Sequence, residues 1–176
     1  MRLNAKRYTL HPISGFTLIE FLIYILIVGV LLLVLSQFGF RVVNDRARTI
    51  AQREVEQNLR FSIDEINRAL RGASGINAPS LGGTGSLLSL AMDNPAKNPT
   101  LFSRLGATLM KQEGASPAVP LTSFQVNVTN LIFTNTSYPG TPGSVNVSIT
   151  IEYKNPSGRS EYSDTVTFSS SASLRK

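Results

Sequence analysis

One carboxylate stands out in this sequence because of its surroundings. Glu20 is the only formally charged residue among the 25 residues from Phe16 to Phe40. A carboxylate inside a lipid bilayer costs about 3 kcal/mol on insertion scales, so such a group normally has a partner. The run contains no Lys, Arg or His that could provide one. Glu20 is therefore a candidate functional residue whose partner has to come from outside the run.

A purely local role for Glu20 is the alternative. The segment Thr17-Leu18-Ile19-Glu20 fits the capping-box pattern, Ser/Thr-x-x-Glu, just before an apolar run. In a capping box the glutamate only satisfies a backbone amide at the start of a helix. The sequence leaves both interpretations of Glu20 open.

Residues for other chemistry are scarce. The chain has no cysteine, and its single histidine, His11, lies before the apolar run. The glycine-rich stretch 72–86 is not followed by Gly-Lys-Ser/Thr, so it is no Walker motif. The acidic residues of the second half are scattered and form no EF-hand loop: Asp93, Glu113, Glu152, Glu161 and Asp164. We expect no catalytic activity, metal site or cofactor.

The apolar run itself indicates a membrane segment. As a helix, residues 16–40 would be about 38 Å long, enough to cross a hydrocarbon core of about 30 Å. The run is longer than the apolar region of a secretory signal peptide, which has about 7–15 residues. Its far end, Ser36 to Arg41, includes Phe38 and Phe40 and makes a poor small-x-small cleavage site. We therefore expect the segment to stay in the mature protein.

The residues before the run predict its orientation. Residues 1–15 carry Arg2, Lys6 and Arg7 and no acid. Positive charge beside an apolar run stays in the cytoplasm, so the N-terminus is expected inside and the C-terminus outside. Without this leader, 14 basic residues remain against 11 acidic ones, a formal charge of +3. That charge is too small to indicate nucleic-acid binding by itself.

Six consecutive residues carry a resemblance to a known family. Gly15-Phe16-Thr17-Leu18-Ile19-Glu20, after a short basic leader and before an apolar helix, resembles the processing site of type IV pilins and pseudopilins. The resemblance implies that prepilin peptidase cuts between Gly15 and Phe16, and that Phe16 is then N-methylated. It also implies partners, namely other pilin subunits and an inner-membrane assembly platform, with lipid around the helix before assembly into an extracytoplasmic filament.

On this resemblance, Glu20 acquires a partner. A cut after Gly15 creates a cation, the α-amino group of Phe16, at the depth of the carboxylate. That amine could pair with Glu20 of its own chain or with Glu20 of a neighbour, which would bring subunits into axial register. In pilins the matching glutamate is linked to subunit recruitment.

The helix is expected to continue well beyond the membrane. Residues 41–71 contain no Gly or Pro, and apolar residues recur at helical spacing: Val55, Leu59, Ile63, Ile66 and Leu70. We expect these five to form the core between the helix and a sheet. Phe61 falls on the opposite side of the helix, where we expect it to pack under a nearby loop.

The rest of the chain reads as strands. Residues 100–104 and 108–112 flank Leu105-Gly106-Ala107 as a hairpin, and apolar residues alternate from Val145 to Tyr153. Apolar residues alternate at Phe124, Val126 and Val128. The alternation then continues with the opposite parity at Leu131 and Phe133, which predicts a bulge at Asn130. Tyr162, Val166 and Phe168 form a returning strand.

The predicted fold is α+β and pilin-like, with one long N-terminal helix packed on an antiparallel β-sheet. Its expected parts are a leader (1–15), a transmembrane and filament-core helix (16–40), an amphipathic continuation (41–71), a glycine-rich loop (72–86) and the sheet domain (87–176). Patches such as Leu59 to Ile63 and Leu121-Thr122-Ser123 resemble minor pseudopilins of the J/W-like type, which implies a minor subunit.

Three functions remain open on the sequence. The first is a structural subunit of a type IV pilus, a type II secretion pseudopilus or a competence pilus. The second is a minor pilin that binds DNA or a surface, which needs a cluster of cations: Lys97, Arg104, Lys111, Lys154 and Arg159. The third is an unprocessed single-pass membrane protein with an extracytoplasmic β domain. Cleavage at Gly15 separates the third from the other two.

Overall fold

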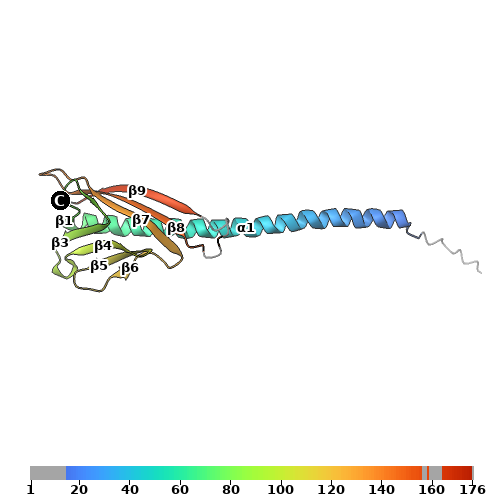
Figure 1. Ribbon diagram of the computed structural model, residues 1–176, viewed down its shortest axis with the longest axis horizontal. Helices are drawn as coiled ribbons and strands as arrows, with labels where there is room; N and C mark the ends of the chain where they lie inside the picture. The colour runs from blue at the N-terminus through green and yellow to red at the C-terminus, as the bar shows by residue number, and fades with distance from the viewer. Residues whose placement is uncertain (1–14, 156–157, 159–163, 176) are drawn as a thin grey trace, which may run out of the picture. The chain divides into compact units, whose positions relative to one another are not determined.

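A computed structural model describes residues 15–155, 158 and 164–175 of the chain (Figure 1). In the described part, its single α-helix, α1, runs from Leu18 to Arg71, and nine strands follow. The chain divides into two compact units within α1, between Val43 and Asn44. The first unit contains the apolar part of α1, and the second contains the rest of α1 and both β-sheets.

Helix α1 begins and ends where the sequence gives the appropriate signals. Thr17 precedes its first residue, and no proline interrupts its 54 residues. Arg68 and Arg71 lie in the last turn, where positive charge interacts favourably with the carboxyl end of a helix. The amide of Gly72 donates to the carbonyl oxygens of Arg68 and Ala69, both at 3.2 Å, and closes the helix.

The strands form two antiparallel sheets. The first has the order β1 (Ala73–Ala78), β3 (Leu87–Met92), β4 (Thr100–Leu105), β5 (Thr108–Glu113) and β6 (Val119–Pro120). The second has the order β2 (Thr84–Gly85), β7 (Val126–Asn135), β8 (Ser144–Tyr153) and β9 (Thr165–Ser173). A short 3₁₀ helix, η1 (Pro95–Lys97), connects β3 to β4. The fold confirms a long N-terminal helix packed on antiparallel β-structure.

The sequence predicted one sheet, and the structure has two. The first sheet ends at β6, which is only two residues long and includes Pro120. Proline has no N–H to donate to a further strand, so it is confined to a sheet edge. Strand β7 therefore starts the second long ladder instead, while it remains in contact with β3, β4 and β5 of the first sheet.

Two local strand predictions are confirmed. Strands β4 and β5 form the predicted hairpin around Gly106, which has a φ of 61° at the turn. The register of β7 on β8 shifts between Val128 and Asn130. This irregularity explains why apolar positions on both parities of β7 are buried, namely Val126, Val128, Leu131 and Phe133.

Two other strand predictions are wrong. The stretch 72–86, expected to be a loop, contains β1 and β2. Strand β1 pairs with β3 because small residues such as Gly75 and Ala91 allow close pairing, although their composition does not favour strands. Phe124 lies before β7 and is 84% exposed, so it does not belong to the strand's buried face. The predicted strand residue Tyr162 lies outside the described residues.

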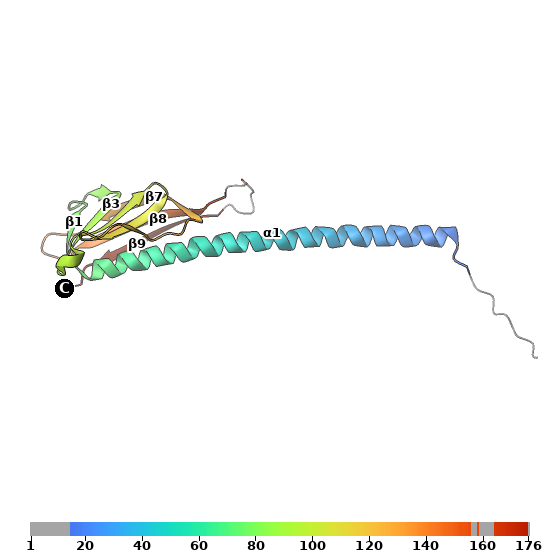
Figure 2. The same ribbon diagram turned by 90° about the horizontal axis from the view of Figure 1, so that it is seen from below.

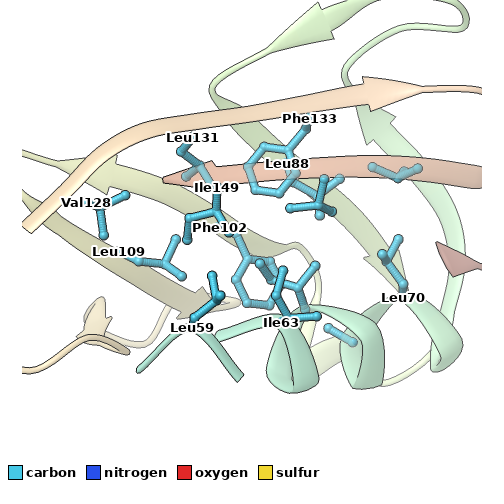
Figure 3. Close-up of a cluster of buried hydrophobic side chains, with 14 of the residues drawn as sticks. Leu59, Ile63, Leu70, Leu88, Phe102, Leu109, Val128, Leu131, Phe133 and Ile149 are labelled. Carbon is cyan, nitrogen blue, oxygen red and sulfur yellow. The ribbon is translucent and has the colours of Figure 1, made fainter. Parts of the chain in front are cut away.

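The core of the second unit lies between α1 and the two sheets (Figures 2 and 3). Helix α1 contributes the five residues of the predicted stripe, all buried: Val55, Leu59, Ile63, Ile66 and Leu70. Both sheets contribute large buried side chains, including Leu88, Phe102, Leu109, Phe133 and Ile149. Phe61 is 51% exposed and lines a shallow surface pocket with residues 120–123.

Truncation of the buried stripe should destabilise the second unit far more than truncation of Phe61. We expect Leu59→Ala or Ile63→Ala to lower the free energy of unfolding by about 2–5 kcal/mol, because each leaves a cavity in the core. Phe61→Ala should cost less because its ring is half exposed. Urea melts of a fragment lacking residues 1–40 measure all three. A larger loss for Phe61→Ala than for the other two would place the wrong face of α1 against the sheets.

Candidate functional site

The amino end of α1 is capped by Thr17. The hydroxyl oxygen of Thr17 accepts a hydrogen bond from the amide of Glu20 at 3.3 Å. The carbonyl oxygen of Thr17 accepts the first helical bond, from the amide of Phe21 at 3.1 Å. One half of the predicted capping box is therefore present, because the capping residue satisfies an amide of the first turn.

The carboxylate of Glu20 does not complete that box. Its Oε1 instead accepts a hydrogen bond from the hydroxyl of Tyr24, at 3.2 Å and one turn further along the helix. Among the described residues, no hydrogen bond joins the Glu20 carboxylate to the backbone of Thr17. The structure therefore places the side chain of Glu20 against Tyr24 and not against the amino end of α1.

Tyr24 also contacts Phe16. Their rings meet edge to face, with centroids 5.8 Å apart and an interplanar angle of 69°. Sequence reasoning overlooked Tyr24, although it is the one phenol between residues 16 and 40 and lies at i+4 from Glu20. That spacing brings two side chains together on the same face of a helix. The structure thus joins the predicted site residues Phe16 and Glu20 through a third residue.

The predicted cleavage site lies outside the helix. Residues 15–17 are exposed and precede the first helical residue, Leu18. A Cβ atom added to Gly15 would meet no atom within 4 Å, so no contact with a described residue requires a glycine there. The Gly15–Phe16 bond is therefore accessible in the chain as described.

The apolar part of α1 has exposed side chains throughout its described length. Large side chains such as Phe21, Ile27, Leu33 and Phe38 are at least half exposed. By length and composition, α1 includes a segment that can cross a membrane, and none of that segment is buried inside the structure. A helix that is apolar all round is stable only when lipid or neighbouring helices surround it.

The candidate DNA-binding cations are engaged within the chain. Lys111 forms ion pairs with Glu113 at 2.8 Å and Glu65 at 3.0 Å, and Lys97 pairs with Glu113 at 3.4 Å. Arg104 donates to the carbonyl oxygens of residues 128 and 129. Lys154 is exposed, and Arg159 lies outside the described residues. The first three cations therefore have structural partners and do not form a free basic patch.

A partly buried polar network, which sequence reasoning overlooked, attaches α1 to the segment before β7. Asn58 is 7% exposed on the core side of the helix, and its Oδ1 accepts from the amide of Ser123 at 2.7 Å. The hydroxyl of Ser123 donates to Glu54 at 2.8 Å. The sequence signal for this network was an asparagine within the apolar stripe, because a buried side-chain amide needs hydrogen-bond partners.

No site for a metal ion emerges from the described ranges, where no three His, Cys, Asp or Glu side chains gather. Among the described residues, a shifted pKa is found at Lys111 and Glu113, which form an ion pair. Burial lowers the pKa of Lys111, but hydrogen bonds to Glu113 and Glu65 outweigh burial and raise it above its usual value. The hydrogen bond from Lys111 in turn lowers the pKa of Glu113.

Comparison with known proteins gives one match. A family model described as the prokaryotic N-terminal methylation motif matches residues 11–36. Neither the comparison with curated proteins nor that with solved structures gives a significant match. The matched segment includes Gly15, Phe16 and Glu20, and it is the segment that resembles a type IV pilin processing site. The long helix packed on antiparallel sheets is a pilin-like α+β arrangement.

The ion pairs of Lys111 predict a pH-dependent loss of stability in Lys111→Met. Because the pKa of Glu113 is lowered, its pairing stabilises the fold at pH values above the ordinary glutamate pKa of 4.5. This stabilisation is lost as the pH falls through the pKa of Glu113 in the folded state. We expect the variant to lose about 1 kcal/mol at neutral pH, and less at about pH 3. The raised pKa of Lys111 predicts a second loss of wild-type stability in alkali, above 10.5.

Urea melts of wild type and variant across this pH range provide the measurement. Lys154→Met is the matched control, because Lys154 is exposed and forms no ion pair with another described residue. An equal loss of stability at acid and neutral pH in Lys111→Met would contradict the ion-pair explanation.

Proposed function

We propose that this chain is a subunit of a type IV pilin-like filament that assembles through its N-terminal helix. One observation carries the proposal: the methylation motif at residues 11–36 leads directly into an apolar helix whose side chains are exposed. Prepilin peptidase cuts between Gly15 and Phe16, Phe16 is N-methylated, and the helix moves from lipid into contact with other subunits at the assembly platform.

The geometry of the cleavage site supports processing. A peptidase needs an accessible, non-helical backbone, and residues 15–17 provide one. No contact with a described residue requires glycine at position 15, so in this proposal the glycine serves recognition by the peptidase.

The proposed orientation follows from the basic leader. Arg2, Lys6 and Arg7 keep the N-terminus in the cytoplasm, where the cut takes place, and the sheet domain lies outside the membrane. The subunit is therefore a single-pass protein of the inner membrane before assembly and part of an extracytoplasmic filament afterwards. Its role is structural and not enzymatic, which agrees with the absence of cysteine and with a single histidine that leaves with the leader.

Within the filament we propose a minor role, close to that of a J/W-like pseudopilin. The support is the patchy likeness in residues 59–63 and 121–123 and the lack of cysteines that could stabilise a long-lived fibre surface. The machine could be a pilus, a secretion pseudopilus or a competence pilus. DNA binding is the weaker alternative, because Lys97, Arg104 and Lys111 already have partners in the chain.

Processing is tested by the intact mass of the protein isolated from membranes. We expect the mass of residues 16–176, with or without a methyl group on Phe16. The control is Gly15→Val, which should retain the leader because the peptidase no longer finds its residue. An intact leader in the wild type, or cleavage after the apolar run, would contradict the proposal.

The minor role is tested by stoichiometry in sheared filaments. We expect a few copies of this chain among many copies of another subunit, and loss of filaments when the chain is deleted. This chain as the dominant band would contradict the minor role and leave the filament proposal intact.

A further inference from the structure

A glutamate in the first turn of a helix has a favourable partner in its own helix. The backbone amides at the amino end are unsatisfied, and the helix dipole is positive there. In a processed pilin-like chain, the amine of residue 16 would add a full positive charge at the same end. Glu20 is therefore expected to fold back onto its own chain unless another group holds it elsewhere.

Tyr24 is such a group. Its hydroxyl donates to Oε1 of Glu20 at 3.2 Å, and this draws the carboxylate one turn away from the amino end. Helical side chains point toward the amino end, so a tyrosine at i+4 lies over the glutamate. In the lipid core no water competes for this hydrogen bond.

The tyrosine is itself held in place by its neighbour. The ring of Phe16 packs edge-on against the ring of Tyr24. The site thus consists of Phe16, Glu20 and Tyr24 on one side of the helix, with the amide of Glu20 fixed by Thr17. The tyrosine hydroxyl is the only side-chain donor to the Glu20 carboxylate among the described residues.

One oxygen of the carboxylate remains available. Oε1 of Glu20 accepts from Tyr24, while Oε2 has no hydrogen-bond partner among the described residues. An ionised carboxylate offers about four acceptor positions, so it can bind an amine while it keeps the tyrosine. A cation that approaches from outside the chain reaches Oε2 without breaking an existing contact.

We propose that Tyr24 is a positioning residue for assembly. It holds the carboxylate of Glu20 off the amino end of its own helix and presents Oε2 to the amine of Phe16 in a neighbouring subunit. This inference rests on the proposed function, because the amine exists only after the cut at Gly15. In this proposal Tyr24 favours the pairing of Glu20 with a neighbouring chain over the pairing with its own amine.

Two substitutions separate the hydroxyl of Tyr24 from its ring. Tyr24→Phe keeps the ring that contacts Phe16 and removes the donor, whereas Tyr24→Gln keeps a donor at i+4 and removes the ring. We express each full-length variant in cells that retain the other pilin genes. Immunoblots of membranes establish insertion and leader removal, and the readout is the amount of variant in sheared filaments relative to the amount in membranes.

Both variants should be inserted and processed at the level of the wild type. We expect incorporation of Tyr24→Phe to fall about three- to fifteenfold, which corresponds to one side-chain hydrogen bond within a membrane. Tyr24→Gln should retain more incorporation than Tyr24→Phe. Incorporation of Tyr24→Phe at the wild-type level would overturn the proposal, as would a greater loss in Tyr24→Gln, which would assign the effect to ring packing.

A spectroscopic measurement tests the hydrogen bond independently of assembly. The infrared band of the Glu20 carboxyl group, assigned by its disappearance in Glu20→Gln, is recorded for the full chain in lipid vesicles. We expect the band to shift in Tyr24→Phe, because the carboxyl group loses its donor. An unshifted band would overturn the proposal. If the wild type itself is not incorporated into filaments, the proposed function fails, while the infrared comparison still decides whether Tyr24 binds Glu20.

Discussion

The cost of a carboxylate inside an apolar helix governs the first unit of this protein. A membrane helix needs no charge to be inserted, and Glu20 makes insertion less favourable by about 3 kcal/mol. The structure partly offsets that cost with the hydroxyl of Tyr24 and leaves one carboxylate oxygen without a partner among the described residues. A helix with such a group gains stability when a cation reaches it. On the proposed function, the amine that a cut at Gly15 creates on Phe16 supplies that cation.

The second unit depends on a different property of the same helix. From Val55 to Leu70, α1 presents an apolar stripe against which both sheets pack. Burial of this stripe stabilises the unit but does not by itself fix how the sheets are aligned along the helix. The polar contacts of Asn58 with Ser123 and of Lys111 with Glu65 fix the position of the sheets along the helix, because each contact forms in only one alignment. The second half of α1 therefore forms the domain core, while on the proposed function its first half serves lipid and neighbouring subunits.

Much of this fold could be predicted from periodicity. Apolar residues at helical spacing identified the five buried residues of α1, and alternation of period two identified β8. The glycine turn at Gly106 identified the hairpin of β4 and β5. Strand β1 escaped prediction because its small residues have low strand propensity and it exists only through pairing with β3. The division into two sheets depends on where pairing stops, at Pro120, which no hydrophobic pattern encodes. Within the site, the motif identified Gly15, Phe16 and Glu20, but the direction of the Glu20 side chain depends on the phenol at position 24.

On the proposed function, Glu20 is needed for assembly and not for insertion or folding. The most direct test is the incorporation of Glu20→Val, a change that removes the charge and keeps an apolar, membrane-compatible side chain. The variant is expressed beside the wild type, and each form is quantified in membranes and in purified filaments. We expect the variant to be inserted and cut after Gly15 like the wild type but to be strongly depleted from filaments. Equal amounts of both forms in the filaments would contradict this expectation.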